Sequence, residues 1–151
     1  MYVLGWEEIM MTDFSSVKEK VVIVTGAADG LGKAIAETYA ANGIKVIVSD
    51  VNVQKGEQVV ENIIKSEGQA VFYKANVANE EEIIALVQFA VETYGKLDGI
   101  VNNAGMAAPN KVLHELSLAE FEAVQNVNFK GVFLGMKYGI EAILKSKSTG
   151  G

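Results

Sequence analysis

The sequence predicts an α/β fold in which helices cover both faces of a parallel sheet. Two observations lead to this class. Short apolar runs alternate along the chain with longer segments whose apolar residues have helical spacing. These short runs are apolar at nearly every position, which is typical of strands buried on both faces. A length of 151 residues suggests that the elements form one domain.

Four of the apolar runs are expected to form strands. Each is short, contains Val, Ile or Ala, and is followed by a polar or glycine-containing segment. They lie at residues 21–24, 45–49, 70–75 and 97–101.

The segments between the strands are expected to form helices, because their apolar residues recur at helical spacing and a glycine closely follows each segment. These helices lie at residues 31–41, 53–66 and about 80–94. A fourth helix is expected to start after Ser117, with Glu120 completing a capping box, and to reach about Lys145. Gly131 and Gly135 are expected to interrupt it.

Strands and helices thus alternate four times. With right-handed crossovers, this order gives a Rossmann-like parallel sheet with helices on both faces, truncated to about four βα units. Residues 20–151 are assigned to this unit, because the regular pattern begins only near Lys20. Residues 1–19 are assigned to an N-terminal extension.

Composition argues against several classes of function. The formal net charge of −6 disfavours nucleic acid as a partner, because binding phosphates requires clustered basic residues. No apolar stretch is long enough to span a membrane. The chain has no cysteine and a single histidine, so no metal site is expected. These features fit a cytoplasmic protein.

The junction of the first strand and first helix carries three glycines, in the segment Thr-Gly-Ala-Ala-Asp-Gly-Leu-Gly that starts at Thr25. Gly26 permits a tight turn, Gly30 lets the backbone approach a pyrophosphate, and Gly32 lets helix and strand pack closely. The free N–H groups and positive dipole end of the helix favour an anionic ligand. The alternative is an ordinary loop that needs glycines for its backbone.

Asp50 ends the second strand, 20 residues after Gly30, where a carboxylate can accept hydrogen bonds from ribose hydroxyls. Its charge would repel the additional phosphate of NADP, and no arginine stands beside it. Asp29 adds a second negative charge. The sequence therefore predicts a dinucleotide site that prefers NAD to NADP. The alternatives are a solvated strand end for Asp50 and an exposed loop acid for Asp29.

The spacing Thr-Gly-x-x-x-Gly-x-Gly, combined with Asn-Asn-Ala-Gly at residues 102–105, resembles the short-chain dehydrogenase/reductase family. The resemblance runs from about Lys20 to the C-terminus. It implies an NAD(H)-dependent oxidoreductase that transfers hydride between alcohol and carbonyl groups, with a small alcohol or carbonyl as substrate. It also implies a homo-oligomer, because related enzymes commonly pair such helices between subunits.

The resemblance implies roles for individual residues. The glycine turn would lie along the pyrophosphate, and Asp50 would meet the adenosine ribose. Asn76-Val77 is similar to an Asp-Val pair that touches the adenine, with Asn in place of Asp. The residues expected to bind the cofactor are Gly26, Asp29, Gly30, Leu31, Gly32, Asp50, Asn76, Val77, Asn103, Ala104 and Gly105.

The resemblance assigns one catalytic residue, Asn128, which would hold a helix kink and a water of a proton relay. From the residues alone, an Asn that only marks a kink or a solvent-facing turn is favoured. The family's Tyr-x-x-x-Lys pair is absent, because none of the five tyrosines has Lys four positions later.

The segments that carry the catalytic Ser, Tyr and Lys would therefore lie beyond Gly151, and the 151-residue chain is expected to be inactive alone. The alternative is a catalytically incompetent dinucleotide-binding or interaction module. In either case the fourth strand would lie at an open sheet edge. The apolar residues of the last helix would lack neighbours, so we expect self-association. They are Val132, Phe133, Met136, Ile140 and Ile143.

Overall fold

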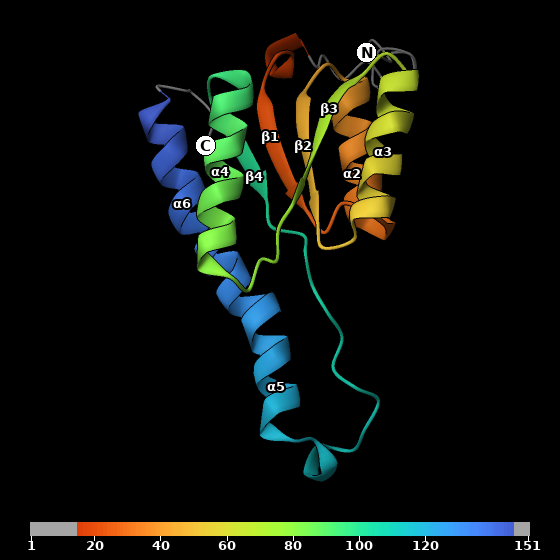
Figure 1. The fold of residues 1–151 in the computed structure, drawn as a ribbon, viewed down its shortest axis with the longest axis vertical. Helices are drawn as coiled ribbons and strands as arrows, with labels where there is room; N and C mark the ends of the chain where they lie inside the picture. The colour runs from red at the N-terminus through yellow and green to blue at the C-terminus, as the bar shows by residue number, and fades with distance from the viewer. Residues whose placement is uncertain (1–14, 147–151) are drawn as a thin grey trace, which may run out of the picture.

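The structure, a computed structural model, describes residues 15–146 and confirms the Rossmann-like α/β fold (Figure 1). Its sheet contains four parallel strands in the order β3-β2-β1-β4. The strands are β1 (Val21–Thr25), β2 (Lys45–Asp50), β3 (Gln69–Lys74) and β4 (Gly99–Val101).

Helices cover both faces of this sheet (Figure 1). On one face lie α2 (Gly30–Ala41) and α3 (Val53–Lys65), and on the other lie α4 (Glu80–Tyr94) and α6 (Gly131–Lys145). The helix α5 (Leu118–Gln125) extends past the carboxyl ends of the strands and joins α6 through η3 (Asn126–Lys130). Two short 3₁₀ turns complete the described chain, η1 (Ser15–Val17) and η2 (Leu113–Glu115).

The central strand β1 shows why the predicted strands are apolar at every position. Val21 and Ile23 pack into the cluster formed with α4 and α6, whereas Val22 and Val24 pack into the cluster formed with α2 and α3. All four side chains are buried. Burying each of them contributes about 1.5–3 kcal/mol, and only a sheet covered on both faces uses every position of a strand.

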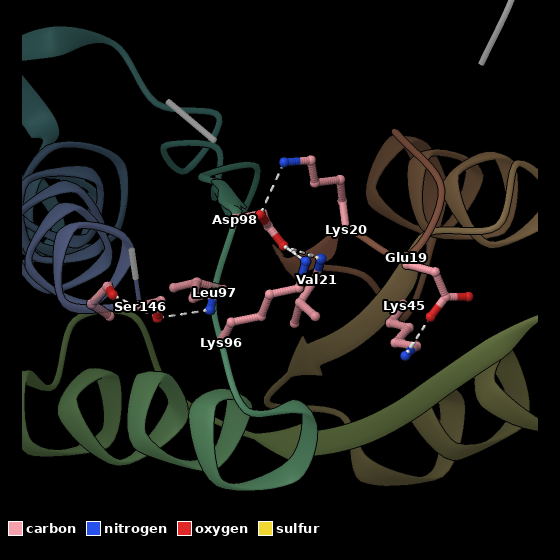
Figure 2. A network of polar contacts seen from close by, with 9 residues as sticks. Glu19, Lys20, Val21, Lys45, Lys96, Leu97, Asp98 and Ser146 are labelled. Carbon is pink, nitrogen blue, oxygen red and sulfur yellow. Dashed lines mark hydrogen bonds and ion pairs between the residues drawn. The ribbon is translucent and has the colours of Figure 1, made fainter. Parts of the chain in front are cut away.

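The amino ends of β1 and β4 are joined by the buried carboxylate of Asp98 (Figure 2). Its oxygens lie 3.2 Å from Lys20 Nζ and 2.9 Å from Lys96 Nζ, and one accepts the backbone N–H of Val21 at 2.9 Å. A carboxylate leaves water only when such partners replace it. This network lies at the opposite end of the strands from their carboxyl termini and has a structural role.

The strand β4 begins at Gly99 and not at Leu97 as expected, although the backbone N–H of Asp98 still donates to the carbonyl of Val21 at 2.8 Å. The backbone N–H of Leu97 donates to Ser146 Oγ at 3.2 Å, and Asp98 turns toward the two lysines (Figure 2). The regular ladder with β1 therefore starts two residues later than the apolar pattern suggests.

The last helix is interrupted, but the glycines do not interrupt it. Gly131 and Gly135 lie within α6, where an added Cβ would overlap Val77 and Asn102. Their function is close packing, because neighbouring side chains already fill the space. The interruption is η3, a π-helical turn in which the N–H of Gly131 donates to the carbonyl of Asn126.

The exposed face of α6 differs from the expectation in two residues, because Val132 is half-buried and Ile143 is buried. Phe133, Met136 and Ile140 are exposed, but Ile143 is buried in the core cluster beneath α4 and α6. Leu144, at 73% exposed, lies on the open face instead. Between residues 15 and 146, no helix is long and apolar enough to cross a membrane.

Candidate functional site

A groove of about 340 Å³ lies at the carboxyl ends of the strands. Its position follows from the topology: the chain leaves β1 toward β2 on one side, whereas β4 lies on the other, and such reversals open a crevice above the sheet. Six residues predicted from the sequence line this groove. They are Gly26, Asp50, Asn76, Val77, Ala104 and Gly105.

The backbone of the glycine turn has the positive φ angles that glycine adopts readily. Gly26 and Gly30 have φ angles of +65° and +53°, in the region that favours glycine. An added Cβ at Gly32 would overlap the carbonyl of Gly26 and the side-chain amide of Asn103. Around Gly30, by contrast, no atom lies within 4 Å of that position, so the turn is open on this side.

Asn103 fixes the turn to the end of β4. Its Nδ2 donates to the carbonyl oxygens of Thr25 and Gly26 at 2.9 and 3.2 Å. The hydroxyl of Thr25 accepts the backbone N–H groups of Asn103 and Ala104, each at 3.1 Å, and donates to the carbonyl of Val101. Since Thr25 is buried, these bonds are shielded from water and join the end of β1 to the end of β4.

Asp50 aims its carboxylate at the glycine turn. One oxygen accepts the N–H of Ala28 at 3.0 Å, and the other accepts the N–H of Asn52 at 2.9 Å. A carboxylate has about four acceptor positions, so two backbone donors leave room for further donors from a ligand. The residue is half-buried and lines the groove.

Asp29 and Leu31 lie on the outer rim of the turn. Asp29 accepts the N–H of Gly30 at 2.8 Å and pairs with Lys55 Nζ at 2.6 Å. The hydrogen bond from Lys55 and, next, that from Gly30 hold the pKa of Asp29 below its usual value. Leu31 is 71% exposed, and neither residue is part of the groove lining.

Asn76 and Val77 form the wall of the groove beyond β3. Asn76 is exposed, and its Oδ1 accepts the N–H of Ala78 at 3.0 Å. Its backbone N–H donates to Glu82 at 2.8 Å, which fixes the loop to the start of α4. Val77 is buried against Gly131 and also lines the groove.

Asn128 lies in η3, below Gly105. Its Oδ1 accepts the N–H of Met106 at 2.9 Å, and its Nδ2 donates to the carbonyl of the same residue at 2.9 Å. An amide carries no proton that titrates in the ordinary range, so this side chain positions the backbone and does not itself act as acid or base. The structure thus places Asn128 next to Met106, a residue that lines the groove.

Sequence reasoning assigned no role to Thr25, Lys55 or Met106. Thr25 gave a weak signal, a hydroxyl at the end of a buried strand. Lys55 gave none, because 26 positions separate it from Asp29. Only the fold brings such distant residues together.

Outside the groove, two other kinds of site are to be considered in the described part of the chain, a metal centre and a second groove. From residue 15 to residue 146, no group of three or more His, Cys, Asp or Glu is arranged to hold a metal ion. A larger open groove of about 620 Å³ runs between α4 and α6, lined by residues such as Val91, Tyr138 and Glu141. It contains none of the predicted site residues and lies away from the strand ends.

Fold and groove together define a Rossmann-like α/β protein. The chain belongs to the short-chain dehydrogenase family, because the family profile described as "short chain dehydrogenase" matches residues 20–151. The family predicted from the two glycine-containing motifs is thereby confirmed.

Individual relatives agree with this assignment. The chain is 40% identical over 138 residues to a cyclohexanol dehydrogenase from an Acinetobacter species. This alignment covers 91% of this chain and 54% of the relative. A hydroxysteroid dehydrogenase from Escherichia coli superposes with a TM-score of 0.81 at 34% identity, covering 85% of this chain and 54% of that one.

A short-chain dehydrogenase/reductase from Burkholderia phymatum, solved in complex with NAD, gives a TM-score of 0.85 at 29% identity. The match covers 89% of this chain and 47% of that chain. The chain therefore spans about half the length of the relatives that it matches.

Proposed function

We propose that this chain holds the adenosine and pyrophosphate part of a nicotinamide dinucleotide, in an NAD(H)-dependent oxidoreductase that acts on small alcohols or carbonyls. The groove at the strand ends carries this proposal, because Asp50 and the glycine turn meet there. Family membership and the NAD complex of the Burkholderia relative support it.

The residues present suit such a ligand. A volume of about 340 Å³ falls within the usual range of small-molecule sites, roughly 300–1,000 Å³. The N–H groups in the first turn of α2 lack carbonyl partners within the helix, and although the Asp29 side chain accepts that of Gly30, the others are free to donate to a pyrophosphate. When bound, the dinucleotide donates or accepts the hydride. Asp50 would accept hydrogen bonds from the ribose hydroxyls.

The charges at the groove favour NAD over NADP. Asp50 lines the groove and Asp29 lies on the outer rim of the glycine turn, so both negative charges would repel the additional phosphate of NADP if the ribose contacts Asp50. All 13 basic residues of the sequence are lysines, so no arginine offers the bidentate contacts that a phosphate prefers.

Calorimetric titration of the 151-residue chain with NAD⁺ tests the proposal. We expect binding, and we expect Asp50→Ala to weaken it by about tenfold or more, because the variant removes charge-assisted hydrogen bonds. Glu57→Ala is the matched control, since it removes an exposed acid from α3 outside the groove. Absence of NAD⁺ binding, or equal losses in both variants, would contradict the proposed site.

We further propose that the 151-residue chain binds the dinucleotide without turnover. Asn128 is the one residue expected from the family's catalytic set, and it holds the Met106 backbone. An assay that follows NADH absorbance with NAD⁺ and simple alcohols tests this second candidate function. Hydride transfer by this chain would contradict it.

The partner that we propose is a second copy of the chain. Phe133, Met136, Ile140 and Leu144 form an exposed apolar stripe along α6, and such stripes mark interaction surfaces. Light scattering is expected to show self-association, and Ile140→Glu is expected to reduce it. A monodisperse monomer at high concentration would contradict this proposal. The cytoplasmic location, the absence of a nucleic-acid partner and the domain boundary at residue 20 stay predictions.

A further inference from the structure

The ion pair between Asp29 and Lys55 crosses the rim of the candidate groove. Asp29 is the residue before Gly30 in the glycine turn, and Lys55 lies in the first turn of α3. The distance from Lys55 Nζ to Asp29 Oδ2 is 2.6 Å, although 26 positions separate the two residues. The pair therefore joins the starts of two helices that both begin at the carboxyl edge of the sheet.

Asp50 connects this pair to the groove. Its carboxylate accepts the N–H of Ala28, the residue next to Asp29, and that of Asn52, which caps α3. The side chain of Asn52 in turn accepts the backbone N–H of Lys55 at 3.1 Å. Asp29, Asp50 and Lys55 thus form one charged cluster with two negative groups and one positive group.

The ammonium of Lys55 is accessible to a ligand, but its charge is already paired with that of Asp29. Its side chain is 58% exposed and that of Asp29 is 72% exposed, so neither is confined by packing. Asp29, and then Asp50, raise the pKa of Lys55, so the lysine stays charged throughout the neutral range. Lys33 also lies near Asp29 but pairs with Glu37 at 3.9 Å.

We propose that Lys55 determines how strongly this site discriminates between NAD and NADP, and that its ion pair with Asp29 keeps the site selective for NAD. This inference rests on the proposed dinucleotide site. The 2′-phosphate of NADP would extend from the ribose that Asp50 contacts, toward the rim. There Asp29 repels it and also neutralises the one lysine of the cluster that could bind it.

The experiment measures dissociation constants for NAD⁺ and NADP⁺ at fixed ionic strength and compares their ratio between variants. Asp29→Asn keeps an oxygen for the N–H of Gly30 but removes the charge. We expect it to improve NADP⁺ binding relative to NAD⁺ by roughly fivefold, as an exposed ion pair allows. In the Lys55→Gln background, the same substitution is expected to lose most of this gain.

A second ion pair on α3 provides the matched control. Glu61 and Lys65 pair at 3.6 Å near the other end of the helix, and their substitutions Glu61→Gln and Lys65→Gln change the net charge in the same way. Neither is expected to alter the ratio of the two dissociation constants. A change as large as that of Asp29→Asn would indicate a general charge effect and overturn the inference.

The outcomes separate the inference from the proposed function. If the unsubstituted chain binds neither dinucleotide, the proposed function fails. If it binds NAD⁺ but Asp29→Asn leaves the ratio unchanged, only the role of the ion pair fails. If the gain persists in the Lys55→Gln background, repulsion by Asp29 alone explains the selectivity and Lys55 is not the determinant.

Discussion

The side chain of Asn128 holds the backbone of Met106 from both sides, because its Oδ1 accepts the N–H and its Nδ2 donates to the carbonyl, each at 2.9 Å. The two residues lie on η3 and on the loop after β4, 22 positions apart. This pair links the π-helical turn to the floor of the groove, since Met106 lines it.

We expect Asn128→Ala to release this loop. Loss of both bonds should speed hydrogen exchange at the Met106 amide by about fivefold or more, because each such bond contributes about 0.5–1.5 kcal/mol. Asn126→Ala is the control, since Asn126 lies in the same turn and no side-chain bond from it exists among the described residues. Equal exchange in all three proteins would show that the pair does not hold the loop.

The hydroxyl of Thr25 is expected to contribute measurably to the free energy of unfolding, because it makes three hydrogen bonds. Thr25→Val keeps the shape but leaves the backbone N–H groups of Asn103 and Ala104 without this acceptor. The free energy of unfolding should fall by about 1–3 kcal/mol in urea denaturation. Thr38→Val, on the exposed face of α2, should change it by less than about 0.5 kcal/mol. A neutral Thr25→Val would refute the link.

Two glycines of the turn are expected to respond differently to alanine. Gly32→Ala places a Cβ against the carbonyl of Gly26 and the amide of Asn103, so it should cost about 2 kcal/mol or more of unfolding free energy. Gly30→Ala meets no neighbour within 4 Å and costs only backbone strain, about 1 kcal/mol. Thermal denaturation compares them, and the reverse order would contradict the close packing at Gly32.

The start of α5 should loosen in acid. The hydrogen bond from Lys111, followed by those from Ser117, lowers the pKa of Glu120 from 4.5 to about 2. A carboxyl with a lowered folded-state pKa stabilises the fold above its unfolded pKa, and this contribution is lost as the pH falls from about 4.5 toward 2. The protection of amides 117–121 against exchange, measured relative to the intrinsic exchange rate at each pH, should therefore fall in that window.

Substitutions identify the group responsible. Glu120→Gln removes the ion pair with Lys111 and should abolish the acid-dependent change at α5. Glu122→Gln should leave it in place, because Glu122 is an exposed acid on the same helix without an ion pair in the described residues. If the same acid-dependent loss of protection occurs in Glu120→Gln, another group causes it.

The strands and the glycine turn could be predicted because their signals are local. Buried strands need apolar residues at every position, as in β1, and the glycines of the turn stand at a strand-to-helix junction that the sequence itself shows, although the fold also packs Gly26 and Gly32 against the end of β4. Gly131 and Gly135 misled the prediction for the opposite reason. Their partners Val77 and Asn102 lie on other elements, so the sequence alone shows helix-weakening residues and hides the packing that they serve.

The same distinction applies to the candidate site. Asp50 could be assigned from its place at a strand end, but its bond to Ala28 spans 22 positions. The contacts of Asn103 with Thr25 span 78 positions, and no local pattern encodes them. Sequence motifs therefore located the residues of the groove, whereas the links that hold the groove in shape required the fold.

An NMR titration of the ¹⁵N-labelled chain with NAD⁺ tests directly whether the groove at the strand ends binds the dinucleotide. We expect the amide shifts to concentrate at residues 26–32, 50–52, 76–77 and 104–106, the segments around the groove. Shifts confined to the groove between α4 and α6, or the absence of any shift at saturating NAD⁺, would contradict it.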